Sequence, residues 1–360
     1  MSRFLDSKFS NLEPYVPGEQ PKDREYIKLN ANESPYPPTP AVLEALRSEA
    51  ATALNLYPDA ACRELAGLLA EQFGLGEGNV LLANGSDDIL NFCFLAFCER
   101  GVVFPDVSYG FYEVFADLYH IDVLRPKMGA GLTIDPADYT GTGRCVVIAN
   151  PNAQTGVALP LSAVEGIVKG SPESVVVVDE AYVDFGGETA VPLVGKYENV
   201  LVVRTFSKSA SLAGARLGYA VGPEELIEDL KKLKYSTNPY SVNRLTLLAG
   251  EAALQDEAYF RACCDAIMAN RALAAEGLRG LGCRLTESLA NFLLVAAPGL
   301  SGAAYQAALR EAGILVRYFD QPRIRDYQHR QPRGNAGAAR CHAADSGKGE
   351  CACGRQAWNA

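Results

Sequence analysis

Short apolar runs rich in valine alternate with helix-like segments through the middle of the chain. The runs at residues 80–83, 102–104, 145–149, 175–178 and 200–203 are typical of strands buried inside a parallel sheet. The segments between them carry apolar residues at helical spacing. This alternation, from about residue 80 to 233, predicts an α/β fold with a mostly parallel sheet and right-handed crossovers.

The pattern changes towards the end of the chain. A long helical stretch over residues 244–281 is expected to bridge to a smaller α+β domain with strands at 291–295 and 314–317. Residues 1–38 are rich in Pro, Asn and Tyr, show little periodicity and read as an arm. We therefore predict an N-terminal arm over 1–38, a large three-layer domain over 39–240 and a small domain over 241–327.

The composition changes again after Tyr327. Residues 328–360 contain no Leu, Ile, Val, Met, Phe or Tyr. Such a segment cannot bury enough apolar area to offset the entropy lost on ordering. We predict that this tail is aberrant and disordered.

Charge narrows the classes of partner. The 360 residues carry a formal net charge of -10, with a pI near 5.0, which argues against nucleic acid or an anionic membrane surface as a partner. Residues 1–15 hold no continuous apolar stretch, and no run approaches the length of a membrane span. We therefore expect a cytoplasmic protein. Most of its 10 cysteines lie singly in apolar segments, as free thiols do in reducing compartments.

Lys208 is the chemical centre of a stretch of small, hydroxyl and basic residues from 199 to 218. A lysine amine forms a Schiff base with a carbonyl only when partly deprotonated, which burial and nearby cations favour. Thr205, Ser207 and Arg216 offer hydroxyl and guanidinium donors suited to a phosphate. For this segment alone, a solvated lysine in a polar turn remains the simpler interpretation.

Asp179 strengthens the covalent interpretation. It directly follows the run at 175–178, so we expect it at the carboxyl end of a strand, where open α/β sheets bind ligands. A carboxylate there can keep a pyridine nitrogen protonated, and that protonated ring is the electron sink of pyridoxal phosphate. At ~4 Å and an effective dielectric of about 20, such a pair is worth roughly 4 kcal/mol before desolvation.

Gly85 and Ser86 are the predicted phosphate cup. They follow the strand-like run at 80–83 and open an apolar helix. Backbone N–H groups at a helix start face one spot, and the helix dipole adds to their attraction for a phosphate. A glycine-containing helix start is more often only a cap, so this prediction depends on its combination with Lys208.

These motifs together resemble the fold-type I pyridoxal-phosphate aminotransferases. The resemblance is carried by Asp-Glu-Ala-Tyr at 179–182, Ser-Lys-Ser-Ala at 207–210 and Ala-Gly-Ala-Arg-Leu-Gly at 213–218. Segments 14–18, 28–35, 57–59 and 291–292 resemble one branch of the family, the histidinol-phosphate aminotransferases. The resemblance covers about residues 9 to 327. It implies a fold-type I transferase, with a large three-layer domain and a smaller α+β domain.

The resemblance also implies roles around the cofactor. Tyr109 stacks on the pyridine ring and Tyr182 supports the phenolic oxygen. Tyr57 reaches the cofactor phosphate of the neighbouring subunit, so that the enzyme works as a homodimer. The family's N-N-P-T-G pattern is altered here, and Asn152 or Asn150 is expected to reach the phenolic oxygen in place of the missing asparagine.

Two residues are predicted to bind substrate. Tyr15, on the arm that crosses the substrate opening in this family, is a candidate wall of the site. Arg317 ends a predicted strand and is expected at the substrate phosphate, although without the resemblance it reads as a solvated strand-end charge. No metal site is expected, because the cysteines and His342 of the tail match no common zinc spacing.

The tail departs from the family, which has there a strand of the type L-R-I-S-V-G whose arginine holds the substrate carboxylate. That arginine would fall near His329 or Arg330. Synonymous codons for residues 328–339, read one base later, can spell S-I-A-N-R-E-E-M-Q-A-L, which resembles the expected continuation. We hypothesise that the tail is out of frame. Resequencing the encoding DNA tests this, and the absence of a shifted frame with family-like coding would contradict it.

The resemblance implies transamination between L-histidinol phosphate and 2-oxoglutarate in histidine biosynthesis, through a Lys208 aldimine with pyridoxal 5'-phosphate. Released Lys208 is expected to move the proton between the substrate carbon and the cofactor. Three alternatives stay open. They are a pyridoxal-phosphate decarboxylase of a phosphorylated amino acid, an aromatic amino acid aminotransferase, and a cofactor-binding chain inactivated by its altered C-terminus.

Overall fold

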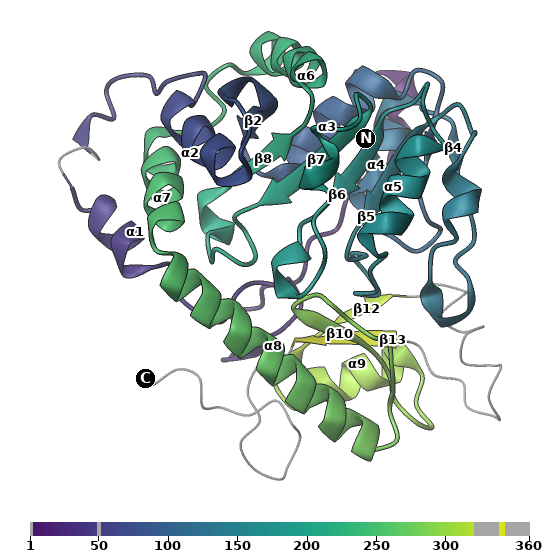
Figure 1. Ribbon diagram of the computed structural model, residues 1–360. Helices are drawn as coiled ribbons and strands as arrows, with labels where there is room; N and C mark the ends of the chain where they lie inside the picture. The colour runs from purple at the N-terminus through teal and green to yellow at the C-terminus, as the bar shows by residue number, and fades with distance from the viewer. Residues whose placement is uncertain (1–2, 49–51, 320–337, 343–360) are drawn as a thin grey trace.

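The structure, a computed structural model, describes residues 3–48, 52–319 and 338–342. A large domain of sheet and helices lies above a smaller one, and the long helix α8 (Glu257–Gly280) runs diagonally from the first to the second (Figure 1). Within the described residues, no helix has both the length and the apolar character that crossing a membrane requires.

A seven-stranded sheet forms the centre of the large domain, in the order β2-β8-β7-β6-β5-β3-β4. Strand β8 runs antiparallel to both of its neighbours, and the other pairs are parallel. This confirms the mostly parallel α/β sheet expected from the valine-rich runs. The strand bounds are β2 Val80–Ala83, β3 Val102–Val103, β4 Val123–Leu124, β5 Cys145–Ala149, β6 Val176–Asp179, β7 Val200–Thr205 and β8 Gly218–Val221.

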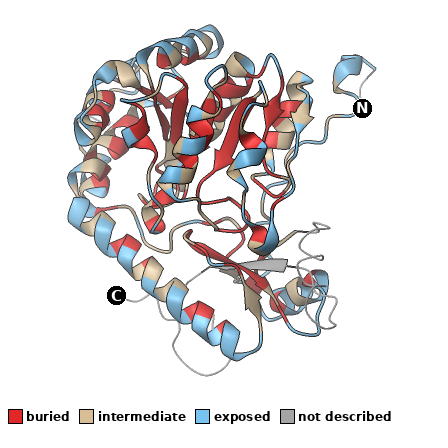
Figure 2. Cartoon of the chain, turned by 45° about the vertical axis from the view of Figure 1, so that its right-hand side comes forward, coloured by how far each residue is buried: buried red, intermediate tan, exposed pale blue. Residues whose placement is uncertain are grey.

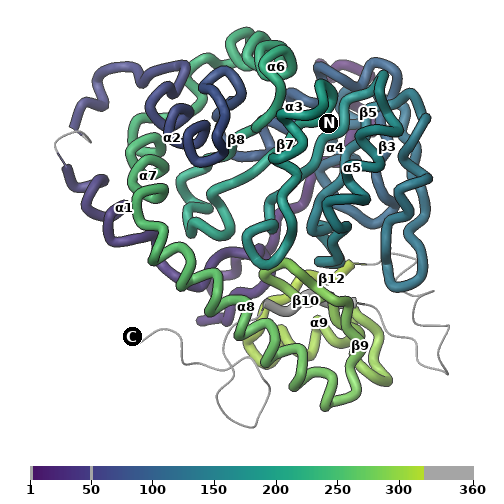
Figure 3. The backbone as a smooth tube through the Cα atoms, in the orientation of Figure 1, coloured from purple at the N-terminus to yellow at the C-terminus, as the bar shows by residue number. Residues whose placement is uncertain are grey.

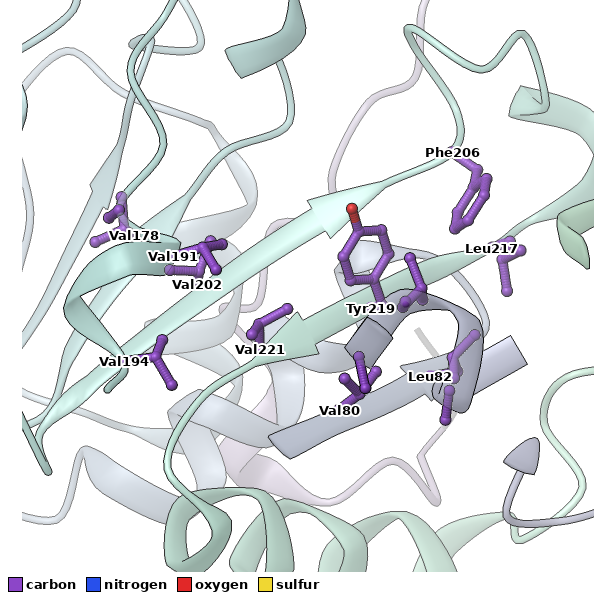
Figure 4. Close-up of a cluster of buried hydrophobic side chains, with 14 of the residues drawn as sticks. Val80, Leu82, Val178, Val191, Val194, Val202, Phe206, Leu217, Tyr219 and Val221 are labelled. Carbon is purple, nitrogen blue, oxygen red and sulfur yellow. The ribbon is translucent and has the colours of Figure 1, made fainter. Parts of the chain in front are cut away.

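Helices cover both faces of this sheet and make three layers (Figures 1 and 2). Because successive side chains of a strand point to opposite faces, Val176 and Val178 of β6 pack into one apolar cluster and Val177 into the other. Figure 4 shows part of the first cluster, where valines of adjacent strands meet. The first face carries α1 (Pro40–Ala45), α2 (Arg63–Phe73), α5 (Leu161–Lys169) and α7 (Arg244–Gln255), and the second carries α3 (Ser86–Phe97), α4 (Phe111–Tyr119) and α6 (Glu224–Thr237).

The domain boundary at residue 240 stays a prediction, and the structure shows on which core the helices beyond it pack. The helical stretch beyond it consists of two helices, and the first, α7, packs Leu247 and Ala252 into the large-domain core. Asp256 separates the two helices and caps α8 by accepting from the Tyr259 N–H. The sequence showed one long helical pattern, but where that helix breaks and what it packs on depend on tertiary contacts.

The small domain contains a four-stranded sheet in the order β12-β13-β10-β9, with helix α9 (Gly302–Glu311) and α8 (Figure 3). The predicted strand at 314–317 is divided in two. Its first part, β11, pairs in parallel with β1 of the arm, and β12 turns to the other sheet. The strand bounds are β1 Ile27–Lys28, β9 Arg284–Leu285, β10 Phe292–Ala296, β11 Ile314–Leu315, β12 Arg317–Phe319 and β13 Ala338–His342.

Strand β13 lies inside the tail that the composition predicts to be disordered. It pairs antiparallel with β10 on one side and with β12 on the other. For residues 338–342 the prediction of disorder is therefore wrong, because the backbone groups of neighbouring strands can order a segment whatever its side chains. The remaining tail residues, 328–337 and 343–360, lie outside the described residues.

Candidate active site

A cavity of about 260 Å³ opens where β6 and β7 end. Parallel strands end at the same edge of a sheet, so residues far apart in the sequence meet there. Most of the residues predicted from the sequence to act at the site line this cavity: Ser86, Tyr109, Asp179, Tyr182, Thr205, Ser207, Lys208 and Arg216.

Lys208 lies in the loop after β7, and its amine faces this cavity. Lys208 Nζ donates to the carbonyl oxygen of Ala31, 3.2 Å away, on the N-terminal arm. The same nitrogen lies 5.9 Å from the centroid of the Tyr182 ring. The arm therefore holds the lysine through a neutral acceptor, which leaves the amine available for covalent chemistry.

Asp179 ends β6 and is buried. Its Oδ2 accepts from the hydroxyl of Tyr112 at 2.7 Å, and its Oδ1 accepts from the Ala181 N–H at 3.2 Å. Burial raises the pKa of Asp179 from the usual 3.8 to about 6, against these two hydrogen bonds and the charge of Lys208, which favour the carboxylate. A cation placed beside this acid would remove most of the cost of its burial.

Tyr182 is positioned from the arm as well. Asn32 Nδ2 donates to the Tyr182 hydroxyl oxygen at 2.8 Å, and the ring packs edge-on against Phe292. Because the hydroxyl oxygen already accepts from Asn32, its own proton is free to be donated to an oxygen in the cavity.

The predicted phosphate cup is built by close backbone approach. Gly85 has φ +90° before α3, and a Cβ there would lie 2.7 Å from Arg216 Nη2. A Cβ on Gly218 would lie 2.3 Å from the backbone nitrogen of Ser86. Thr205 Oγ1 donates to Ser207 Oγ at 2.9 Å beside them. Glycine at both positions keeps this end of the cavity open to backbone, hydroxyl and guanidinium donors, the set that binds phosphate.

Asp87 organises the side chains around this cup. Its Oδ1 accepts from the Tyr109 hydroxyl at 2.9 Å, and its Oδ2 lies 3.3 Å from Arg216 Nη2. Burial, with Asp87 adding to it, raises the pKa of Tyr109 well above its usual value. The Tyr109 ring therefore stays neutral and is held in the cavity wall, where a flat ligand can stack on it.

A second cavity of about 430 Å³ adjoins the first and shares Tyr109, Tyr182 and Lys208 with it. The two predicted substrate residues, Tyr15 and Arg317, meet in its wall. The Arg317 guanidinium lies 5.6 Å from the centroid of the Tyr15 ring, and its Nη2 donates to the carbonyl oxygen of Val16 at 2.8 Å. The arm and the small domain thus close one side of the space next to Lys208.

A protein-family model described as aminotransferase class I and II matches residues 24–337. The chain belongs to this family. Among curated proteins it is 46% identical, over 91% of its length and 94% of the relative's, to the histidinol-phosphate aminotransferase of Marinomonas sp. (strain MWYL1). It is 43% identical, over 91% and 93%, to that of Brachyspira hyodysenteriae.

Solved structures show the same fold. The histidinol-phosphate aminotransferase of Sinorhizobium meliloti, solved in complex with pyridoxal-5'-phosphate, matches with a TM-score of 0.81 at 24% identity, covering 95% of this chain and 94% of that one. The enzyme of Clostridium acetobutylicum matches with a TM-score of 0.78 at 22% identity, covering 89% and 94%. These likenesses confirm the fold-type I architecture of this aminotransferase.

The donor set of this aminotransferase fits a ligand with a phosphate at one end and a protonated ring nitrogen at the other. Ser86, Ser207, Thr205 and Arg216 suit the phosphate, and Asp179 suits the nitrogen. Lys208 and Tyr182 line the same wall. Pyridoxal 5'-phosphate has these groups, so the residues present fit it.

Tyr57 lies outside both cavities. Its side chain is 78% exposed and stacks on Tyr240, with ring centroids 4.4 Å apart. An exposed aromatic pair of this kind suits a contact with another subunit. The role of Tyr57 in a neighbouring active site stays a prediction.

Neither predicted asparagine lines the cavity. Asn152 Nδ2 donates to the Val107 carbonyl at 2.9 Å, and Asn152 Oδ1 accepts from the Thr155 N–H at 2.9 Å. Asn150 bonds Leu159 through both ends of its amide. These side chains hold their own loop, and Ala153 takes the place in the wall. The structure therefore does not bring Asn152 to the cofactor site.

Sequence reasoning missed the residues that hold the site residues in place, namely Tyr112, Asp87 and Asn32. Tyr112 and Asp87 each stand close to a predicted residue in sequence, Tyr109 and Ser86 respectively. Asn32 lies in the family-like segment 28–35 and adopts a positive φ of 55°, which is uncommon for residues other than glycine. Proximity to a motif was the available signal, but it did not say which partner each side chain meets.

Proposed function

We propose that this chain transfers the amino group of L-histidinol phosphate to 2-oxoglutarate in histidine biosynthesis, with pyridoxal 5'-phosphate as its cofactor. The observation that carries the proposal is that Lys208 and Asp179 line one cavity whose other end is a glycine-built phosphate cup. The curated relatives named histidinol-phosphate aminotransferase support the choice of amino donor.

Each residue has a distinct role in this proposal. When bound, the cofactor supplies an electron sink that stabilises negative charge on the substrate carbon. Asp179 holds the proton on the ring nitrogen, and Tyr182 donates its hydroxyl proton to the phenolic oxygen. Lys208 Nζ would hold the cofactor, and the same amine would carry the proton to and from the substrate carbon.

The remaining residues bind and orient. The cofactor phosphate would be held by Arg216, Ser207, Thr205, Ser86 and the Gly85 backbone, and Tyr109 would offer its ring face to the cofactor ring. In the adjoining cavity, Arg317 meets the substrate phosphate and Tyr15 forms part of the wall.

Two further statements belong to the proposal. The active form is a homodimer, which the exposed Tyr57 and Tyr240 pair supports. The enzyme works in the cytoplasm, in line with a biosynthetic reaction on small polar molecules. The arginine expected to hold the substrate carboxylate falls near His329 or Arg330, outside the described residues.

The test is the half-reaction with histidinol phosphate, followed by cofactor absorbance. This chain is compared with a version that carries the family-like continuation after Tyr327. Conversion to the pyridoxamine form by the restored version supports the proposal, and its loss in the present chain alone would identify the tail as a lesion. If both bind cofactor and neither reacts with histidinol phosphate, the substrate is wrong. Release of carbon dioxide, or conversion of aromatic amino acids only, would then identify the reaction.

A further inference from the structure

A cluster of charged side chains adjoins the chain segments that carry Asp179 and Lys208. It contains Glu180, Asp184 and Arg204, whose side chains are 0%, 28% and 12% exposed. Two carboxylates face one guanidinium at the carboxyl ends of β6 and β7. Apolar side chains would fill such a space at lower desolvation cost, so the cluster calls for a reason beyond packing.

Arg204 joins the two acids. Its Nε lies 3.6 Å from Glu180 Oε2, and its Nη2 donates to Asp184 Oδ1. Glu180 is held further by the Thr189 hydroxyl, which donates to Oε2 at 2.7 Å. Burial raises the pKa of Glu180 to about 7, against the charge of Arg204. Tyr219 on β8 directs its hydroxyl towards this end of β7 (Figure 4).

The cluster touches both chain segments that carry the reaction. Glu180 follows Asp179 in sequence, and its N–H donates to the Val203 carbonyl at 2.8 Å, which fixes the end of β6 against β7. Ser209 follows Lys208, is buried, and donates its hydroxyl to Asp184 Oδ2 at 2.5 Å. Asp184 itself lies in the short helix η6, Val183–Phe185, right after Tyr182.

We propose that Asp184, held by Arg204, is a positioning residue for Lys208 and acts through the hydroxyl of Ser209. The lysine loop is thereby tied to the segment that carries Asp179 and Tyr182, so the three site residues keep one mutual geometry. The inference deepens the proposed function and rests on it for the role of Lys208. A displacement of reacting groups by about 1 Å can cost about 100-fold in rate.

The test compares Ser209→Ala with Ser171→Ala. Ser171 is an equally buried serine whose hydroxyl donates to the Tyr139 carbonyl at 3.2 Å, in the loop before the opposite end of β6. Both variants lose one buried hydroxyl contact, and urea unfolding should report the larger loss of stability for Ser209→Ala, because its bond ends on a carboxylate and that of Ser171 on a neutral carbonyl. Only Ser209→Ala should change the rate at which acetic anhydride labels Lys208 in the cofactor-free protein, measured by peptide mass and expected to differ several-fold.

Kinetics provide the second readout. In the half-reaction, Ser209→Ala should lower kcat by about 10- to 100-fold with little change in KM, because orientation rather than binding is lost. Asp184→Asn keeps the shape of the side chain but removes the negative charge that faces Arg204. It should alter the rate of Lys208 labelling in the same direction as Ser209→Ala. It serves as the deciding variant if Ser209→Ala does not fold.

The inference is overturned if the rate of Lys208 labelling changes no more in Ser209→Ala than in Ser171→Ala. The same holds if it changes no more in Asp184→Asn than in Ser171→Ala. Labelling of the cofactor-free chain needs no substrate. If the amino donor is wrong, the half-reaction with histidinol phosphate fails in the unsubstituted protein, but the Lys208 labelling experiment still works. Failure of the proposed function and failure of the positioning role of Asp184 are therefore distinguishable.

Discussion

The hydroxyl of Tyr112 donates to Asp179 Oδ2 across 2.7 Å, inside the core between α4 and the sheet. Tyr112 is fully buried, and burial followed by the nearby carboxylate raises its pKa well above its usual value. It therefore acts as a permanent donor that favours the ionised form of Asp179. The hydrogen bond from Tyr112 thus allows Asp179 to stay ionised, as the cofactor ring requires, although it is buried among apolar side chains.

Replacing Tyr112 by Phe should weaken cofactor binding at acidic pH. Without the hydrogen bond the pKa of Asp179 rises further above 6, by about one to two units if the bond contributes 1.5–3 kcal/mol. The pH midpoint at which the protein loses pyridoxal phosphate should move up accordingly, as measured by titrating the cofactor at several pH values. Tyr119→Phe is the control, because its hydroxyl on the same helix donates to Asn91. Equal midpoints in both variants would contradict the role of Tyr112.

Asp179→Asn should stabilise the cofactor-free protein at neutral pH while removing tight cofactor binding. The pKa of Asp179 is raised from 3.8 to about 6 in the folded chain. Its contribution to stability is therefore complete below pH 4 and is lost as the pH rises through 6. At pH 7 the variant should gain about 3 kcal/mol in the free energy of unfolding, since each pKa unit corresponds to about 1.4 kcal/mol.

Urea unfolding of both cofactor-free proteins between pH 4 and 7 measures this difference. The rise of the Glu180 pKa is present in both proteins and should cancel. A stability difference that stays constant over this range would show that the ionisation of Asp179 is not its source.

Mixed dimers should test whether Tyr57 serves the neighbouring site. Lys208→Ala and Tyr57→Ala are each expected to be nearly inactive. In a mixed dimer, one site combines an intact Lys208 with an intact Tyr57 from the other chain. Random reassociation of equal amounts should then restore about a quarter of the wild-type sites. Activity assays after mixing check this, and no recovery despite proven subunit exchange would mean that Tyr57 does not act across the interface.

Gly85→Ala should damage the phosphate cup. The new Cβ would lie 2.7 Å from Arg216 Nη2 at a position with φ +90°, so both the guanidinium and the backbone must move. We expect cofactor affinity to fall by at least about tenfold, since a charge-assisted contact is worth roughly 1.5–3 kcal/mol. Isothermal titration with pyridoxal phosphate measures the loss.

Gly67→Ala is the matched substitution, because Gly67 lies in helix α2 and no atom of the described residues lies within 4 Å of the added Cβ. It should leave cofactor affinity unchanged and stabilise the protein by up to about 1 kcal/mol. Equal losses of affinity in the two variants would place the effect of Gly85→Ala outside the cup.

Local patterns in the sequence were enough to predict five of the seven strands of the large sheet, β2, β3, β5, β6 and β7, and the residues at their ends, but not β4 or β8. A continuous β-branched run is both a strand signal and a burial signal. The chain direction then decides which end carries the ligand. Lys208, Asp179 and the Gly85 cup follow from that rule together with the family motifs, and the structure brings Lys208, Asp179 and Ser86 of the cup to one cavity.

The prediction for Asn152 shows what a sequence motif cannot determine. An asparagine near an expected contact can serve the cofactor or hold its own loop, and the sequence does not distinguish these uses. The helix pattern beyond residue 240 is a similar case, because periodicity showed an apolar face but not whether α7 would pack on the large or the small domain. Composition likewise did not reveal β13, whose order comes from the strands on either side.

The sequence by itself thus determined the chemistry. A lysine that can bond the cofactor, an acid that can keep its ring nitrogen protonated and donors that can bind its phosphate must all be present as residue types at strand and helix ends. Only the tertiary structure decided which residues hold them. Tyr112 meets Asp179, Asn32 meets Tyr182, and Ser209 meets Asp184, all across long stretches of chain. Such pairs arise when elements pack, and a hydrogen bond depends on distances of a few tenths of an ångström that no local periodicity encodes.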